Sequence, residues 1–108
     1  NLLEQGQLDE ALRYGVRALE VAPSAPFVMD TLGWIYYKKH LWDQASPLLA
    51  QAAERLEHSP VVRYHYGMLL ARRGEKALAE KELASALSLT AQFPGAREAQ
   101  ETLVSLKQ

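Results

Sequence analysis

The three histidines of the chain, His40, His58 and His65, are its most versatile side chains for binding a metal or transferring a proton. No two of them have the i, i+4 spacing that places a metal-binding pair on one helix face, and the sequence contains no HExxH motif. We therefore predict that they lie at the surface or between helices, and we predict no metal site.

Other catalytic patterns are missing from the sequence as well. It has no cysteine, no GxSxG nucleophile motif and no glycine-rich phosphate loop. Glu75, Glu80 and Glu82 alternate with Lys76 and Lys81, which is typical of a solvated helix face. The sequence favours a protein that is not an enzyme, with no catalytic residue, no cofactor and no small-molecule substrate.

Size and charge limit the remaining classes. With 108 residues, 48% hydrophobic and 23% charged, the chain is expected to fold as a single globular domain. Its 12 Lys and Arg against 13 Asp and Glu give a formal charge of -1, so we expect no nucleic-acid partner. The lack of cysteine leaves the cellular compartment open.

An internal repeat organises the chain. Small and aliphatic residues recur at one regular interval in the pairs Gly33 and Gly67, Ala45 and Ala79, Leu49 and Leu83, and Ala52 and Ala86. The period is about 34 residues, a length typical of stacked helical hairpins. We predict a partial repeat at 1–25, complete repeats at 26–59 and 60–93, and a capping helix at 94–108.

Each complete repeat divides into two predicted helices. They span 27–39 and 43–56 in one repeat and 61–73 and 77–89 in the next, and prolines mark the joins between repeats. Turns are expected at His40 and Gly74, and the same register places a turn at Gly6. Residues 1–5 would then end an earlier helix, so we expect the chain to be part of a longer protein.

The small residues predict close helix packing. Gly33 should face Ala45, and Gly67 should face Ala79, so that two antiparallel helices approach closely. Leu49 or Leu83, one turn further on, would fill the space beyond.

These motifs resemble the tetratricopeptide repeat (TPR) family. The resemblance is carried by Thr31-Leu32-Gly33-Trp34-Ile35-Tyr36, by Val62-Arg63-Tyr64-His65-Tyr66-Gly67, and by the Ala and Leu residues downstream of each. It implies an all-α fold, a right-handed superhelical stack of antiparallel helix hairpins with a C-terminal capping helix. The chain departs from the family pattern at Gly15, Arg63, Tyr66 and Leu70.

Shorter segments carry a narrower resemblance. Asp30-Thr31-Leu32-Gly33-Trp34, Arg63-Tyr64-His65 and Phe93-Pro94 are similar to the C-terminal end of bacterial repeat proteins associated with exosortase and exopolysaccharide systems. This resemblance implies a protein of the bacterial cell envelope or periplasm, with a cytoplasmic location left open.

One helix stripe supplies the candidate binding residues. Residues at offsets of three, seven, ten and eleven share one face of a helix, and the equivalent positions of the next repeat continue that face. In the family that the chain resembles, this face lines a concave groove that receives a peptide or a partner helix. The predicted groove residues are Phe27, Asp30, Trp34, Tyr37, Lys38, Val61, Tyr64, Met68 and Arg72. The alternative for Trp34 and Tyr64 is that they only complete the packing between repeats.

The chemistry of this face suggests the type of ligand. The positions that match the family's clamp for a C-terminal carboxylate cannot form that clamp, so an apolar or amphipathic segment is the expected ligand. Asp30, Lys38 and Arg72 would set its register at the edges.

We therefore predict a protein-interaction scaffold; the alternative is a structural spacer and cap of a longer solenoid with no direct ligand. We also predict that two chains associate through the apolar face of Leu8, Leu12 and Leu19.

Overall fold

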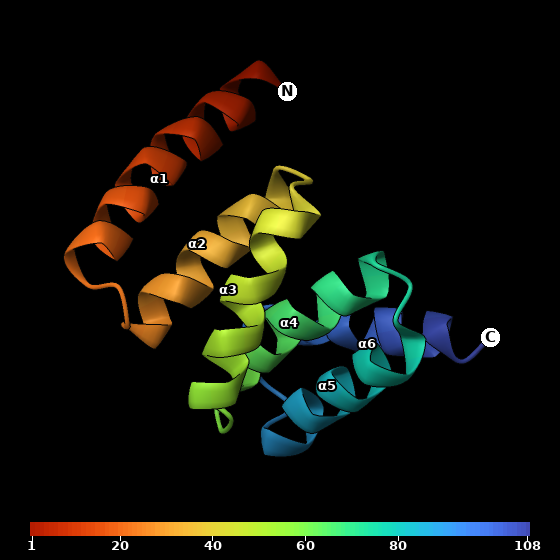
Figure 1. Ribbon diagram of the computed structural model, residues 1–108. Coiled ribbons are helices and arrows are strands. Elements are labelled where there is room, and N and C mark those ends of the chain that lie inside the picture. The colour runs from red at the N-terminus through yellow and green to blue at the C-terminus, as the bar shows by residue number, and fades with distance from the viewer.

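The computed structural model describes residues 1–108 and contains helices joined by short turns (Figure 1). The helices are α1 (Leu2–Val21), α2 (Pro26–Lys38), α3 (Trp42–Arg55), α4 (Pro60–Arg72), α5 (Lys76–Leu89) and α6 (Ala96–Leu106). The bounds of α2 to α5 lie within one residue of those predicted. No helix combines the length and the apolar character needed to cross a bilayer.

Local chemistry sets the ends of these helices. Pro26 and Pro60 occupy the first position of α2 and α4, where the missing amide hydrogen costs no helical hydrogen bond. The hydroxyl of Ser59 caps α4 by accepting a hydrogen bond from the amide of Val62 at 3.3 Å. His40 and Gly74, which hold equivalent positions in successive repeats, turn the chain with positive φ angles of 63° and 79°.

Two hairpins, α2 with α3 and α4 with α5, form the centre of the molecule. A Cβ atom on Gly33 would lie 2.8 Å from Cδ2 of Leu49, and one on Gly67 would lie 2.7 Å from Cδ2 of Leu83. These glycines therefore let the paired helices approach until the leucine side chain meets the opposite backbone. Leu49 and Leu83 are both fully buried.

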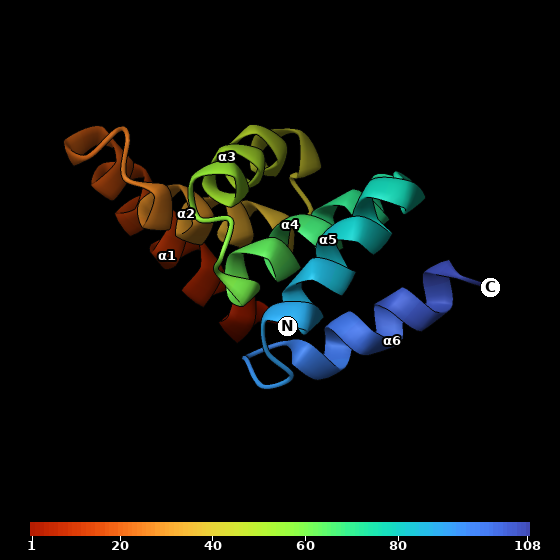
Figure 2. The same cartoon turned by 90° about the horizontal axis from the view of Figure 1, so that it is seen from below.

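The hairpins stack because the first helix of each also contacts the first helix of the next. α2 contacts α4, and α4 contacts α6, in addition to the contacts between helices adjacent in sequence. Figure 2 shows the stack after a quarter turn, with α2 to α5 between α1 and α6. The predicted fold class, an all-α stack of helix hairpins with a capping helix, is confirmed.

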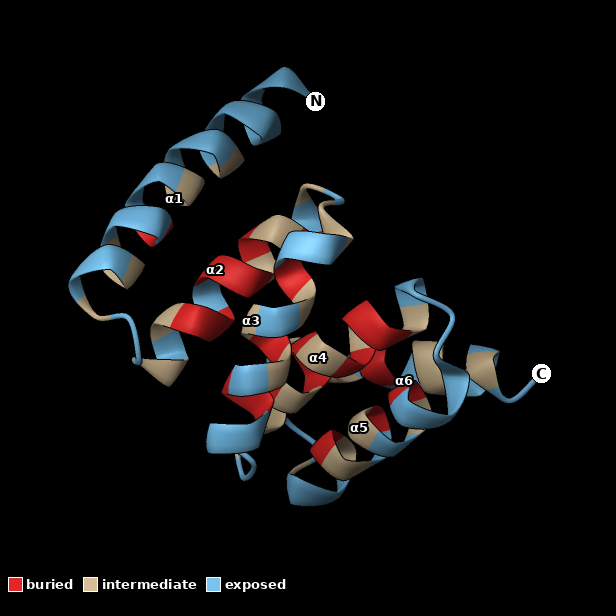
Figure 3. Cartoon of the chain, in the orientation of Figure 1, coloured by how far each residue is buried: buried red, intermediate tan, exposed pale blue.

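The core lies inside this stack. Buried residues concentrate on α2 and α4 and on the facing sides of α3 and α5, while α1 is largely exposed (Figure 3). α6 covers the last hairpin by placing Ala99 in a cluster with Tyr64, Leu83 and Ala86.

The turn predicted at Gly6 is wrong, because α1 continues without interruption from Leu2 to Val21. Asn1 caps the helix by accepting a hydrogen bond from the amide of Glu4 at 2.9 Å, and Gly6 lacks the positive φ found at Gly74. A Cβ atom on Gly15 would lie 3.1 Å from Cδ1 of Leu32. The departure from a bulky residue at position 15 thus brings α1 close to α2.

Candidate functional site

Trp34 is the centre of an aromatic cluster between α2 and α4. Its ring stacks on Tyr37 of the same helix, with centroids 4.4 Å apart, and on His65 of α4 at 4.0 Å. It also meets Tyr64 in a tilted arrangement at 5.5 Å. Trp34 itself is only half-buried. We call Trp34, Tyr37, Tyr64 and His65 the aromatic cluster.

A buried polar pair lies beneath this cluster. Nδ1 of His65 is 2.8 Å from Oδ1 of Asp30, and both side chains are largely removed from water. Buried polar groups need such partners, because each would otherwise lose its hydrogen bonds to water without replacement. The pair joins α2 to α4 and presents the His65 ring to Trp34.

A second polar link joins α4 to α6. The hydroxyl of Tyr64 donates a hydrogen bond to Oε2 of Glu98 at 2.9 Å, and Tyr64 is only 4% exposed. Burial raises the pKa of Tyr64 above its ordinary value, and the hydrogen bond to Glu98 and the charge of that carboxylate raise this pKa further. The phenol therefore stays neutral throughout the physiological range and acts as a hydrogen-bond donor.

Two exposed cations border the aromatic cluster. Nζ of Lys38 lies 5.8 Å from the centroid of the Trp34 ring. The guanidinium carbon of Arg72 lies 6.0 Å from the centroid of the Trp42 ring. Nε of Arg72 also approaches the hydroxyl of Tyr37 at 3.5 Å. Neither cation forms an ion pair with a carboxylate in the structure, so each retains a charge that a ligand can neutralise.

A groove of about 350 Å³ lies between α4 and α6, next to this cluster. Met68, Ala71 and Arg72 line it from α4. Its other wall is supplied by α6, from the residues Glu101, Thr102, Ser105 and Leu106. The lining is mixed, with an aliphatic floor and charges of both signs at its edges.

The structure brings most of the predicted residues to one surface. Trp34, Tyr37, Lys38 and Tyr64 meet around the aromatic cluster, while Met68 and Arg72 line the adjoining groove. Phe27 is apart from them: it is 66% exposed and lines a separate pocket beside α1. Val61 is half-buried at the start of α4.

Burial corrects the positions expected for three of these residues. Asp30 was predicted at the edge of a groove, but it is 7% exposed and its carboxylate is held by His65. Tyr37 and Tyr64 are also buried, so their rings contribute to packing between helices. The position of Tyr64 is therefore that of a residue that completes the packing between repeats.

Sequence reasoning missed the part played by α6 and by Trp42. Trp42, which precedes the helix predicted at 43–56, begins α3 and packs near Tyr37, with ring centroids 5.3 Å apart. The α6 residues occupy repeat positions, because Glu98 is the equivalent of Tyr64, and Thr102 the equivalent of Met68, one repeat later. That register was the signal that could have found them.

The His, Asp and Glu side chains of this surface are not grouped as metal ligands. No group of three or more His, Asp or Glu side chains is arranged to hold a metal ion. His40 and His58 are exposed, and His65 is engaged with Asp30. The chemistry of the surface is that of aromatic contact and charge pairing.

Comparisons with known proteins agree with this architecture. No protein-family model matches the sequence, and no curated protein matches it significantly. Among solved structures, the chain is similar to the first TPR of Spaghetti bound to an HSP90 peptide, with a TM-score of 0.79, 17% identity, and coverage of 98% of this chain and 85% of that one. The chain has the tetratricopeptide-repeat fold.

Two further solved structures have the same fold. The Yersinia enterocolitica type III secretion chaperone SycD, in complex with a peptide of the translocator YopD, matches with a TM-score of 0.77, 22% identity and coverage of 99% of this chain and 85% of that one. MamA MSR-1 matches with a TM-score of 0.76, 25% identity and coverage of 96% of this chain. The chain spans 58% of the length of MamA MSR-1.

Proposed function

We propose that this chain is a protein-interaction scaffold that holds a peptide or helix of another protein against α2, α4 and α6. One observation carries the proposal: the half-buried ring of Trp34 lies beside Lys38 and next to a groove that Arg72 lines, and neither cation forms an ion pair. Aromatic and cationic side chains at the edge of a groove are typical of protein interfaces.

The solved structures with the same fold support this role. SycD is in complex with a peptide of YopD, and the TPR of Spaghetti is bound to a peptide. At 22% and 17% identity, their likeness to this chain concerns the backbone, so the ligand chemistry must come from this chain's own residues. Lys38 and Arg72 favour a ligand with at least one acidic side chain beside an apolar segment.

A second candidate function is a structural spacer and cap within a longer solenoid. The burial of Asp30, Tyr37 and Tyr64 favours it, because these residues use their polar groups on neighbouring helices. A spacer would keep those contacts and need no ligand at Trp34, Lys38 or Arg72.

Our proposal extends to the protein's setting. The motifs around Trp34, Tyr64 and Phe93 resemble bacterial proteins associated with exosortase and exopolysaccharide systems, which favours a scaffold of the bacterial cell envelope. The proposal includes no catalytic step and no cofactor, because the polar groups beneath Trp34 are engaged in structural hydrogen bonds.

A pull-down from bacterial envelope and cytosolic extracts, quantified by mass spectrometry, tests the proposal. The bait is the wild-type chain, and the variant is Lys38→Glu with Arg72→Glu, which reverses two exposed charges without entering the core. Arg13→Glu with Lys76→Glu is the matched control, because it changes the net charge equally at exposed residues outside the groove. We expect a partner that is retained by the control and lost by the groove variant.

The spacer function predicts a different result. Identical protein sets for all three baits, with all three folded by circular dichroism, would overturn the binding proposal. The same outcome would leave the chain as a stacking element of a solenoid.

A further inference from the structure

Another groove lies away from the aromatic cluster, between α1, α2 and α3. Its volume is about 530 Å³. The residues that dominate its lining are Val16, Leu19, Glu20, Leu32, Tyr36 and Leu48. On α2, Leu32 and Tyr36 each lie two residues from Trp34, and such an offset directs side chains to nearly opposite sides of a helix. This groove is therefore separate from the surface in the proposed function.

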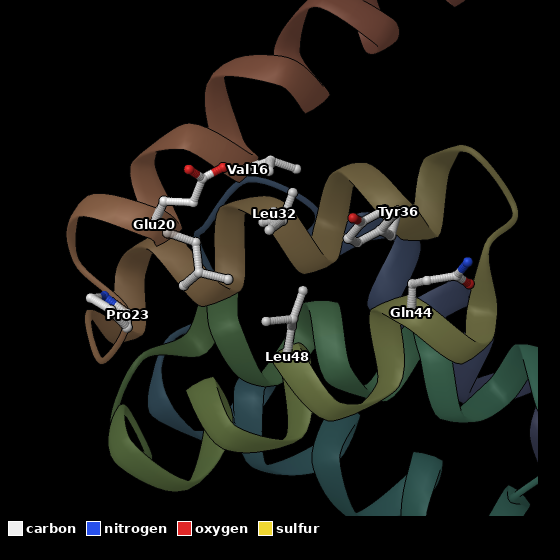
Figure 4. Close-up of a pocket in the computed structure, with 8 residues that line it drawn as sticks. Val16, Glu20, Pro23, Leu32, Tyr36, Gln44 and Leu48 are labelled. Atoms are coloured by element: carbon white, nitrogen blue, oxygen red, sulfur yellow. The ribbon is translucent and has the colours of Figure 1, made fainter.

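Figure 4 shows how the groove is built. Val16 from α1, Leu32 from α2 and Leu48 from α3 converge on its middle, while Glu20 lies towards one end and Tyr36 towards the other. Because α1 packs against α2 alone among the helices, α3 faces α1 across this open space.

The repeat supplies an internal comparison. A second groove of about 280 Å³ lies between α3, α4 and α5, which are the next helices of the stack. Six positions lining the first groove recur one repeat later in the lining of the second: 16 and 50, 19 and 53, 20 and 54, 23 and 57, 32 and 66, and 48 and 82. The two grooves therefore occupy equivalent places in successive repeats but have different lining residues.

The second groove contains cations and an ion pair that the first lacks. Nη1 of Arg63 forms an ion pair with Oε1 of Glu82 at 3.0 Å, and Lys81 adds another cation to the lining. Tyr66 also lines this groove and packs against the buried cluster that includes Ala53.

The first groove has none of these substitutions. The position equivalent to Glu82 is Leu48, which lines this groove, and the positions equivalent to Arg63 and Lys81 are the uncharged Met29 and Pro47. It keeps an acidic residue, Glu20, that has no ion-pair partner in the structure. An apolar groove with a single unpaired carboxylate therefore stands where the next repeat has a closed ion pair.

We infer that this groove binds an amphipathic peptide segment of another protein, which inserts aliphatic side chains against Leu19, Leu32 and Leu48 and places a Lys or Arg beside Glu20. Charge complementarity selects this occupant, because Glu20 is the single charged residue in the lining of this groove, whereas the lining of the second groove, which includes the equivalent Glu54, also contains Arg63 and Lys81. The lining runs along α1 from Val16 to Glu20 and continues to Pro23 just beyond the end of the helix, a span of about two helical turns. A bound helix would therefore use anchors at i, i+3 or i+4, and i+7.

The test is a selection from a display library of peptides about 15 residues long, a length at which isolated helices become marginally stable. Selected peptides should carry aliphatic residues at helical spacing together with a Lys or Arg. Their affinity is then measured by fluorescence anisotropy for the wild-type chain and for its variants.

Two variants probe the groove. Leu48→Glu introduces the residue that the next repeat carries at the same position, and it should weaken binding by about tenfold or more because a carboxylate replaces an apolar contact. Glu20→Lys, at an exposed position, should reverse the preference from basic to acidic peptides. Lys76→Glu, at an exposed position at the start of α5 and outside this groove, is the control and should leave affinity unchanged.

Three results would overturn the inference. The first is a selection that enriches no such peptides, and the second is binding that Leu48→Glu leaves intact while circular dichroism shows a folded variant. The third is a dimer in light scattering that Leu48→Glu abolishes, because a second copy would then occupy the groove. A failure of the pull-down with Lys38 and Arg72 does not affect this test, since those residues lie outside the groove.

Discussion

The hydroxyl of Tyr64 donates a hydrogen bond to Glu98 at 2.9 Å, and the two residues occupy the same position in successive repeats. One repeat earlier, this position is Asp30, whose carboxylate contacts His65. The same face of each first helix is thus tied to the next first helix by one polar contact. These contacts fix the spacing of α2, α4 and α6, on which the proposed binding surface depends.

Alkaline pH should weaken the contact between Tyr64 and Glu98. Burial first, and then Glu98, raise the pKa of Tyr64 in the folded chain, so its stabilising effect is complete below the unfolded value of about 10 and is lost as the pH rises towards the folded value. Tyr64→Phe should reduce the free energy of unfolding by about 0.5–1.5 kcal/mol at neutral pH. Urea unfolding should show this difference shrinking above about pH 10.

Comparison of the two proteins at each pH isolates this effect, because all other tyrosines and lysines titrate in both. Tyr66, whose pKa is also raised by burial, is unchanged in the variant. A constant difference between the wild-type protein and Tyr64→Phe across the pH range would contradict the assigned hydrogen bond.

Gly33 should tolerate no larger side chain. An alanine Cβ would lie 2.8 Å from Cγ and Cδ2 of the fully buried Leu49, and such overpacking costs about 1–3 kcal/mol. The matched control is Gly6→Ala, because Gly6 is helical and open space surrounds its missing Cβ. That variant should gain about 0.5–1 kcal/mol. Thermal unfolding measures both, and equal melting temperatures for the two variants would count against the close approach of α2 and α3.

Asp30 should affect stability and not partner binding. Asp30→Ala removes the hydrogen-bond partner of the buried His65, which should cost about 1–3 kcal/mol. Because Trp34 stacks on His65, its fluorescence should change as well. If Asp30→Ala leaves stability unchanged but abolishes binding of the partner protein, Asp30 contacts the ligand. That result would contradict the buried pair of Asp30 and His65.

Self-association through α1 remains a prediction. Leu8, Leu12 and Leu19 are half-buried on α1, and this helix packs against α2 alone. Light scattering at rising protein concentration should show dimers, and Leu12→Glu should return the chain to a monomer. A strict monomer at high concentration would contradict the prediction.

The repeated part of the fold could be predicted because the same residue types recur at equivalent positions of each repeat. Gly33 and Gly67 mark close contacts, Pro26 and Pro60 mark helix starts, and the helix bounds follow from them. Gly6 has the same position in the repeat as Gly74, but the repeat position alone does not decide whether the chain turns there. Asn1 caps α1, and the backbone at Gly6 is part of that helix.

The candidate site was harder to predict because burial depends on partners far apart in sequence. Trp34 and Asp30 belong to one helix stripe, yet Trp34 is half-buried whereas Asp30 lies beneath it against His65. A stripe defines which residues share a face, but the position of α4 decides which of them reach water. The contribution of α6 depended in the same way on how the capping helix sits against Tyr64.

The most direct test of the binding surface is to map amide chemical shifts in the labelled chain as the partner captured in the pull-down is added. The proposed function predicts shifts centred on Trp34 and Lys38 in α2, on Met68 and Arg72 in α4, and on Thr102 in α6. Shifts that leave Trp34, Lys38, Met68 and Arg72 unchanged while the partner binds would contradict it.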